Sequence, residues 1–511
     1  MSPSVTIYMN LSGIIGAALT IFRRNPSDLF PLYLLGPAVP AIARLGGFAG
    51  AAGIWLYLET TGRLDAARQT LDGLDLNPPP ADADPEALRM YGESLLPLVE
   101  TVFTPVVITL LVVSVVASIS LALVANAVVA AGQFSACLAR LRGQPGIRAG
   151  IVGARRSWTT LLLLRLFEAL LYIGVTLLAG AVVGVAALVS NIAGLVLAFP
   201  VAILWLLALI LIRAVFTFAP VAAVVEEVGV GRSLRQTGEF IRSNPAEALG
   251  YYVVAAAVGF GLASLAGSLV IIEAPTLTAI AGFLVAAPFL DLVKTGLYGD
   301  HTVGIDPPAR PTDSILTAIT RGIRRGWREL RGFVGSQFGL VALMLGLGAV
   351  GFWAGWRVAT PYVGVFETSI TSRLAGTIPP AQALEYATNN WNVAASMAMA
   401  GLALGIPSVV AVLFNGLALG ATARLEVQLE ELIAFVIPHG VFEIPALVFA
   451  GALGIHMGVV YSRLLRGRRS RAAFANDLRM AFWVLVGVAI LLVVAAVIEG
   501  FISPFYWRVF L

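Results

Sequence analysis

Long apolar runs separated by short polar segments dominate the hydrophobic pattern of the chain. A helix needs about 20 consecutive apolar residues to cross a bilayer, and runs of that length recur from end to end. Six of them precede residue 300, at about 29–58, 102–134, 158–188, 192–220, 249–272 and 276–297. The pattern therefore predicts an all-α, polytopic integral membrane protein.

The clearest domain boundary lies in the longest basic stretch. It begins with Asp306-Pro307-Pro308, a composition typical of linkers, and continues as an amphipathic basic helix expected at about 313–331. We therefore expect a six-span membrane domain at 1–300 and a basic cytoplasmic linker with its helix at 301–332. A five-span membrane domain is expected at 333–511.

The second membrane domain contains a stretch that cannot be one ordinary span. Residues 393–421 are too many for one crossing and too few for two, and Gly405-Ile406-Pro407 interrupts them. A single crossing here would export the arginines between 463 and 471. Two short segments hinged at Gly405, or a re-entrant segment, keep those arginines inside and bring the total to about eleven spans. The other expected spans of this domain are at about 333–357, 432–461 and 481–502.

Amphipathic helices are expected to lie on the membrane surface and lead into some of the spans. Residues 5–23 are moderately apolar with a basic end, as in an interfacial helix on the cytoplasmic side. Ile21–Asp28 aligns with Phe240–Glu247, where Asn-Pro ends one helix and starts the next. Such elbow helices could reflect an internal duplication or two independent solutions of the same turn.

Charged residues predict the orientation of the chain. Arginines without matching acids gather at 140–156 and 463–471, whereas loop 61–97 carries seven acids. By the positive-inside rule the arginine segments are cytoplasmic, and loops 61–97 and 358–390 are outside. We expect a multi-pass plasma-membrane protein with a cytoplasmic N-terminus. Its outside loops would contact membrane or envelope proteins, and its arginine clusters would contact anionic lipid headgroups.

Composition narrows the functional classes. Charged residues make up 12% of the chain, half of the roughly 25% usual in soluble domains, and hydrophobic residues make up 59%. Cys137 is the only cysteine, which excludes an intrachain disulfide and a thiolate metal cage. The net charge of +4 reflects arginines placed for topology, so no nucleic-acid partner is expected. No P-loop, dinucleotide fingerprint or nucleophile elbow is present, so no cofactor is expected.

A histidine and a carboxylate form the candidate site. His439 and Glu443 are four residues apart in an apolar run and would share one face of a helix. The pair could be a packing device, in which Pro438 starts the helix and Gly440 lets another helix approach closely. It could also be a polar or proton-coupled binding site, or part of a metal or hydrolytic site.

Two ligands are too few for a metal site, which needs three or four. Glu430 and Glu431 would join only if the turn at 424–431 folds back. We therefore assign no catalytic residue and no metal ligand. Asn415-Gly416 could bind a ligand or close the end of a helix. Arg165, Glu168 and Arg213 lie within spans and are expected to pair with one another or to lie near the cytoplasmic interface, and lining a cavity is the alternative.

The second half resembles the stage II sporulation protein M family over about residues 315–505. The resemblance rests on Asn389-Asn390, Gly401, Gly405, Phe414-Asn415-Gly416, Gly420, Ile437-Pro438-His439-Gly440, Glu443-Ile444-Pro445-Ala446, Ala450-Gly451-Ala452 and Gly454. It implies about five spans. The namesake of the family is a membrane scaffold that recruits peptidoglycan-degrading proteins to a septum in sporulation, but most relatives occur outside spore-formers. Residues 1–300 match no named family.

These observations predict a non-catalytic membrane scaffold or partner-binding protein in envelope or membrane remodelling. The alternative is a transporter or intramembrane enzyme that uses His439, Glu443 and Asn415 in a cavity. A homo-oligomer is compatible with both.

Overall fold

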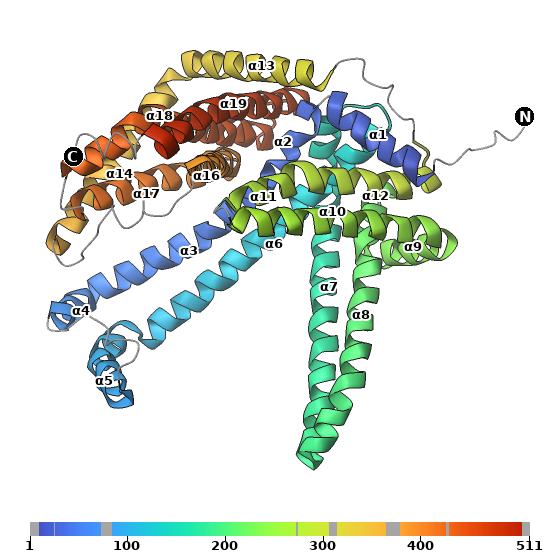
Figure 1. Ribbon diagram of the computed structural model, residues 1–511, viewed down its shortest axis with the longest axis horizontal. Coiled ribbons are helices and arrows are strands. Elements are labelled where there is room, and N and C mark those ends of the chain that lie inside the picture. The colour runs from blue at the N-terminus through green and yellow to red at the C-terminus, as the bar shows by residue number, and fades with distance from the viewer. Residues whose placement is uncertain are drawn as a thin grey trace, which may run out of the picture. The chain divides into compact units, whose positions relative to one another are not determined.

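The fold is helical wherever the structure can be described. The computed structural model describes residues 10–24, 26–72, 84–271, 274–305, 314–363, 379–425 and 429–502, and every regular element within those ranges is a helix (Figure 1). Ten of these helical segments are long and apolar enough to cross a membrane. The predicted all-α polytopic membrane fold is confirmed.

The ten segments fall into six in the first half and four in the second. They are Phe30–Thr60, Pro105–Leu141, Gly146–Val189, Asn191–Val225, Pro245–Val270, Thr276–Thr302, Phe338–Tyr362, Ile406–Leu425, Val436–Leu465 and Arg471–Ile502. The six predicted before residue 300 are therefore all present. In the second half, helix α16 (Pro379–Ala400) replaces one expected apolar segment. This helix carries Glu385 and the amides Asn389, Asn390 and Asn392, which keep its hydropathy below that of a span.

Contacts between residues divide the chain into two compact units, of which the smaller is Val39–Ala125. It contains most of α3 (Leu35–Thr60), α4 (Arg63–Asp72), α5 (Pro85–Val102) and the first part of α6 (Pro105–Leu141). Helices α3 and α6 touch where Gly46 and Gly50 face Ser118 and Ser114. Helices α4 and α5 occupy much of the segment predicted as the outside loop 61–97, whose residues 73–83 lie outside the described ranges.

The larger unit comprises residues 1–38 and 126–511. Its first-half core gathers α1 (Leu11–Arg24), α2 (Phe30–Tyr33), the end of α6, the bases of α7 and α8, and parts of the helices that follow them. At its centre the Tyr33 hydroxyl donates to Asp291 Oδ2 at 2.8 Å and lies 3.4 Å from the buried Cys137 Sγ. The second expected elbow is present, because α9 (Val230–Ser243) ends just before Asn244-Pro245 and α10 (Pro245–Ile271) begins there.

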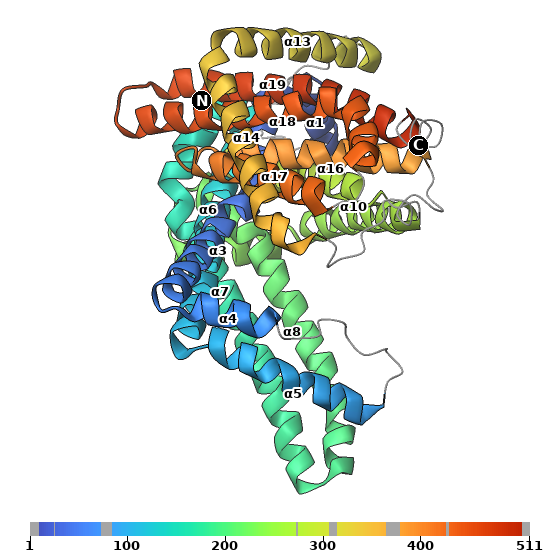
Figure 2. The same cartoon turned by 90° about the vertical axis from the view of Figure 1, so that its left-hand side faces the viewer.

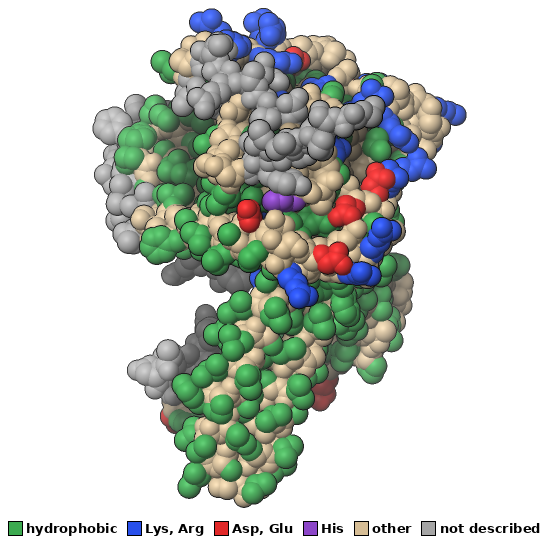
Figure 3. Space-filling model, turned by 90° about the vertical axis from the view of Figure 1, so that its right-hand side faces the viewer, with side chains coloured by type: hydrophobic (Ala, Val, Ile, Leu, Met, Phe, Trp, Pro, Cys, Tyr) green, Lys and Arg blue, Asp and Glu red, His purple; other side chains and the backbone are tan. Residues whose placement is uncertain are grey.

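Helices α7 (Gly146–Val189) and α8 (Asn191–Val225) form a long hairpin. Its outer surface is dominated by exposed leucine, isoleucine, valine and phenylalanine, and charged side chains gather above that apolar lobe (Figure 3). The buried Glu168 pairs with Arg165 at 2.8 Å and with Arg213 at 3.6 Å, so the predicted pairing of these three residues is confirmed. Roughly 33 Å of helix separates Glu168 from the tip, about the thickness of a bilayer core. These charges therefore lie at one edge of the apolar part of the hairpin.

The second half begins with α13 (Ile315–Ser336), the expected amphipathic basic helix, which lies along α19 (Arg471–Val497) (Figure 2). Helix α14 (Phe338–Ala359) follows, then α16, α17 (Ile406–Leu425) and α18 (Leu429–Leu465). The predicted break falls at the turn 401–405 between α16 and α17. There Leu404 and Gly405 adopt φ of 59° and 80°, the left-handed region that reverses a chain.

Glycines bring the helices of the second half into backbone contact. A Cβ placed on Gly420 would lie 1.9 Å from the Phe352 carbonyl oxygen, and one on Gly355 would lie 1.9 Å from that of Leu417. The same holds where Gly401 meets Gly454, at 2.1 Å. Such distances allow no side chain larger than hydrogen, so α14 packs on α17 and the turn at Gly401 packs on α18 as small-residue interfaces do in membranes.

Polar contacts join the two halves inside the larger unit. Asp28 is buried and accepts hydrogen bonds from the Gly146 N–H at 2.7 Å, from Arg140 at 3.3 Å and from Arg479 of α19. Glu385 of α16 accepts from the Thr276 N–H at 2.9 Å, beside a Phe283–Trp391 ring stack. The larger unit therefore continues across the linker at 301–332. The division into domains at that linker stays a prediction from the sequence.

Candidate functional site

The candidate site lies in α18, whose course differs from the one expected. The helix begins at Leu429 and continues through Pro438 and Pro445 to Leu465, so Pro438 does not start it. A proline inside a helix removes one N–H and disturbs one turn, and membrane helices tolerate this where neighbouring elements surround them. The helix therefore keeps His439 and Glu443 one turn apart on a common face, as predicted.

The pair is close without being tightly bonded. His439 Nε2 lies 3.9 Å from Glu443 Oε2, and the side chains are 8% and 22% exposed. That separation exceeds a hydrogen bond, so the contact is an ion pair only when the imidazole is protonated. The two groups are therefore neighbours on one face of α18.

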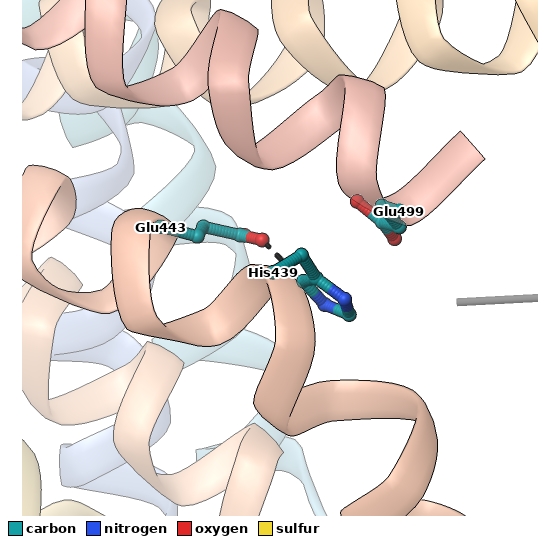
Figure 4. A group of neighbouring side chains, drawn as sticks. All are labelled: His439, Glu443 and Glu499. Atoms are coloured by element: carbon teal, nitrogen blue, oxygen red, sulfur yellow. Dashed lines mark ion pairs between the residues drawn. The ribbon is translucent and has the colours of Figure 1, made fainter. Parts of the chain in front are cut away.

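A third ligand group, Glu499, lies beside the pair and was not predicted from the sequence. It belongs to the π-helical turn η4 (Ile498–Ile502) at the end of α19 and reaches toward the pair from the facing helix (Figure 4). Within the described residues, the donor atoms of His439, Glu443 and Glu499 all lie within 4.8 Å of one another. Glu499 is the only acid after Asp477 and stands in an apolar run, a signal that marks functional positions in membranes.

The site lies near one end of its helices. Roughly 36 Å of helix separates His439 from Arg463, more than the thickness of a bilayer core. Glu499 lies at the far end of α19 from Arg471, and His439 and Glu443 lie in the half of α18 that is farther from the arginines at 463–471. If those arginines lie at one membrane surface, we expect the site nearer to the opposite surface than to the centre of the bilayer.

Pro438 and Gly440, also singled out from the sequence, lie beside the pair on α18. Pro438 is half-buried, and a Cβ on the buried Gly440 would meet Val436 and Ile444 of its own helix at ordinary distances. Among the described residues Gly440 therefore does not mediate the expected close approach of another helix.

Asn415 and Gly416 lie in the middle of α17 and do not close a helix end. The exposed Asn415 donates from Nδ2 to the Ala411 carbonyl oxygen of its own helix at 2.7 Å. A Cβ on Gly416 would lie 2.3 Å from the Gly348 carbonyl oxygen, so this glycine serves the contact with α14. The side chains of Glu430 and Glu431, considered as further ligands, lie outside the described residues.

One imidazole and two carboxylates can act in three ways. They can exchange protons, bind a divalent cation, or form a polar contact between two helices. The presence of Glu499 makes the donor set larger than the sequence indicated.

Comparison with known proteins shows a family similarity within the second half. The family described as stage II sporulation protein M (SpoIIM) matches residues 340–504, which confirms the predicted resemblance. The chain is also similar to the uncharacterized protein MJ0793 of Methanocaldococcus jannaschii, with 26% identity over 121 residues, or 23% of this chain and 68% of that protein. No solved structure matches the chain. The chain is thus a polytopic membrane protein whose residues 340–504 are similar to the SpoIIM family.

Proposed function

We propose, from the match of residues 340–504 to the SpoIIM family, that the protein is a non-catalytic membrane scaffold. It would hold partner proteins in envelope or membrane remodelling, in the plasma membrane and with a cytoplasmic N-terminus. Hydrogen bonds between the first and second halves of the chain are the observation that supports the proposal. Asp28, at the base of the first-half core, is bonded to Arg479 of α19, and Glu385 of α16 is bonded to Thr276.

A scaffold must hold its binding surfaces at fixed positions relative to one another, and the tight helix packing of the second half is rigid enough to do so. Backbone contacts at Gly355 and Gly420 leave no room for sliding between α14 and α17. Buried ion pairs such as Asp28 with Arg140 hold a single arrangement, since moving either partner leaves a charge uncompensated.

Partner proteins are proposed to bind the outside segments 61–97 and 358–390. Along α5, Leu88, Leu96 and, two residues past the segment, Val99 are exposed on one face of the helix, with the exposed acid Glu93 beside them. An exposed apolar stripe next to carboxylates suits an amphipathic basic helix of an envelope protein. Much of the second segment, residues 364–378, lies outside the described ranges.

Anionic lipid headgroups are proposed to bind the arginine clusters. Helix α13 packs on α19 through Gly326 and Leu330 and exposes a stripe of Leu316, Ile319, Ile323 and Trp327. Its arginines 321, 324, 325 and 328 line an adjacent groove. A second hollow of about 600 Å³ is lined by Leu404, Ser462, Arg463, Arg466 and Arg468. An apolar stripe flanked by arginines is typical of interfacial helices, and each arginine contributes about 1 kcal/mol near an anionic surface.

Site-directed photo-crosslinking tests the scaffold. A photoreactive residue at Leu96 of α5 should give discrete protein adducts in native membranes. One at Leu177 of α7, which is also exposed and is expected to face lipid, should give lipid adducts only. Folded yield of both variants is checked by size-exclusion chromatography. Equal adduct patterns at the two positions would contradict the proposal. A reporter fused after Arg469 should read cytoplasmic, and an outside reading would reverse the orientation.

A transporter or intramembrane enzyme is the second candidate, and the position of Glu499 beside His439 and Glu443 favours it. His439→Ala and Glu443→Gln distinguish the two. Loss of cellular function at normal folded yield would favour a working site. Retained function in both variants would favour the scaffold.

A further inference from the structure

We propose that His439, Glu443 and Glu499 bind one divalent transition-metal ion of the Zn²⁺ or Mn²⁺ class, which joins α18 to the end of α19. The inference goes beyond the scaffold role and does not depend on it. Crosslinking tests the scaffold and metal binding tests this site, so either proposal can fail while the other holds.

The donor set selects the ion. One imidazole nitrogen with two carboxylate oxygens suits zinc, manganese and ferrous iron, whereas calcium and magnesium favour ligand sets made of oxygen alone. Three protein ligands leave a fourth position for water, as in open zinc sites. The set comes from two helices, so the ion would bridge them.

The three donor atoms would need to move only slightly closer together to bind an ion. Donor atoms around a tetrahedral zinc ion with bonds of about 2.0–2.2 Å lie roughly 3.4 Å apart. The three donor atoms lie within 4.8 Å of one another, and His439 Nε2 is 3.9 Å from Glu443 Oε2. Glutamate has three rotatable side-chain bonds, so a change of about 1 Å is within reach without moving either helix.

Charge favours an ion at this position. Two ionised carboxylates in apolar surroundings repel each other and lose hydration, which is costly unless a cation compensates them. A divalent ion neutralises both at once. The π-helical turn contributes as well, because it projects Glu499 toward α18 from the last turns of α19, and such turns often occur at functional sites.

An ion can reach the site without crossing the apolar core. Glu499 lies at the end of α19, and His439 lies roughly 36 Å along α18 from Arg463, so we place the site near the membrane surface opposite the arginines at 463–471. By the positive-inside rule those arginines are cytoplasmic, so the ion would enter from the outside compartment.

Metal binding by the full-length chain tests the inference. The protein is purified in detergent through a tag without histidine, stripped with a chelator, and dialysed against Zn²⁺ or Mn²⁺. Mass spectrometry of the bound metal should give one ion per chain. Glu499→Gln, which preserves the shape of the side chain, should weaken binding by about tenfold or more. His456→Gln is the matched control, because His456 lies further along α18 against Phe333 and outside the cluster, and should bind as the wild type does.

The wild-type chain gives a test that needs no variant. Because a ligand that binds only the folded state raises its stability, Zn²⁺ or Mn²⁺ should raise the melting temperature in detergent, and Mg²⁺ at the same concentration should not. Less than one-tenth of an ion per chain, equal affinity of wild type and Glu499→Gln, or equal shifts with Mg²⁺ would each overturn the inference.

Discussion

The second-half bundle and the α7–α8 hairpin contain similar glycine patterns, but only the bundle uses these glycines to pack helices together. Both consist of long apolar helices with glycines four residues apart, such as Gly416 and Gly420 in α17 and Gly180 and Gly184 in α7. Gly416 and Gly420 meet the backbone of α14, but no described atom of another helix lies within 4 Å of a Cβ on Gly180 or Gly184. The spacing of small residues alone therefore does not reveal whether a helix face is packed.

Burial separates the two regions in the same way. In the most apolar stretches of α18 and α19, 56% of the residues are buried, against 6% in α7 and none in α8. Lipid solvates an apolar helix as well as protein does, so hydropathy does not decide which helices gather. Close backbone packing and polar contacts decide it, and the predictions below act on those contacts.

The largest effect is expected at the packed glycines. Gly420→Ala would place a methyl group 1.9 Å from the Phe352 carbonyl oxygen, so α14 and α17 must separate, at a cost of about 3 kcal/mol or more. Gly180→Ala in the hairpin is the control and should leave the melting temperature in detergent unchanged or slightly higher. Similar losses in both variants would show that the hairpin glycines are packed as well.

The junction between hairpin and bundle comes next. Asp28 bonds the first residue of α7, Gly146, and Arg479 of α19, and it lies against the buried Arg140. Asp28→Ala leaves Arg140 uncompensated, and we expect a loss of about 3 kcal/mol in thermal unfolding. Asp65→Ala removes an exposed partner of Arg68 and should change little. A small effect at Asp28 would mean that the two regions are stable independently.

A smaller effect is expected inside the hairpin. Glu168 is buried between Arg165 and Arg213, but both arginines are about half exposed, so solvent screens the pairs. Glu168→Gln should cost about 1 kcal/mol, measured as a shift in the melting temperature, and Glu239→Gln, at an exposed position of α9, should cost less. A loss as large as that of Asp28→Ala would place Glu168 in a dry interface.

The smallest effect is expected at Asn415. Its amide bonds only the Ala411 carbonyl of its own helix and it is exposed, so Asn415→Ala should change stability by less than about 0.5 kcal/mol. Ser408→Ala should cost about 1 kcal/mol, because the fully buried Ser408 hydroxyl donates to the Met397 carbonyl and ties α17 to α16. The reverse order would make Asn415 a functional contact.

The hydrophobic pattern and the distribution of charge were sufficient to predict the fold class and the break near Gly405. The positive-inside rule required an even number of crossings there, and glycine with proline marked the place. Helix α16 escaped detection because Asn389, Asn390 and Asn392 resemble an interface in the sequence. In the structure this helix packs on α19, where Trp391 donates to the Leu485 carbonyl oxygen at 3.1 Å.

The candidate site was predicted in part. His439 and Glu443 share a helix, so a local rule places them together. Glu499 reaches them only through the packing of α19 against α18, and contacts between residues far apart in sequence leave no local pattern. Asp28 was missed as a centre of ion pairs for the same reason, since Arg140 and Arg479 reach it from two other helices.

The single cysteine makes it possible to measure how often the core of the protein opens. Cys137 is fully buried beside Tyr33, in the core at the base of the hairpin, and the sequence contains no other thiol. A thiol reagent can reach it only when that core opens, so the rate of modification reports how often opening occurs without any engineered probe. Ions, lipids or partner proteins that tighten the core would each slow the same reaction.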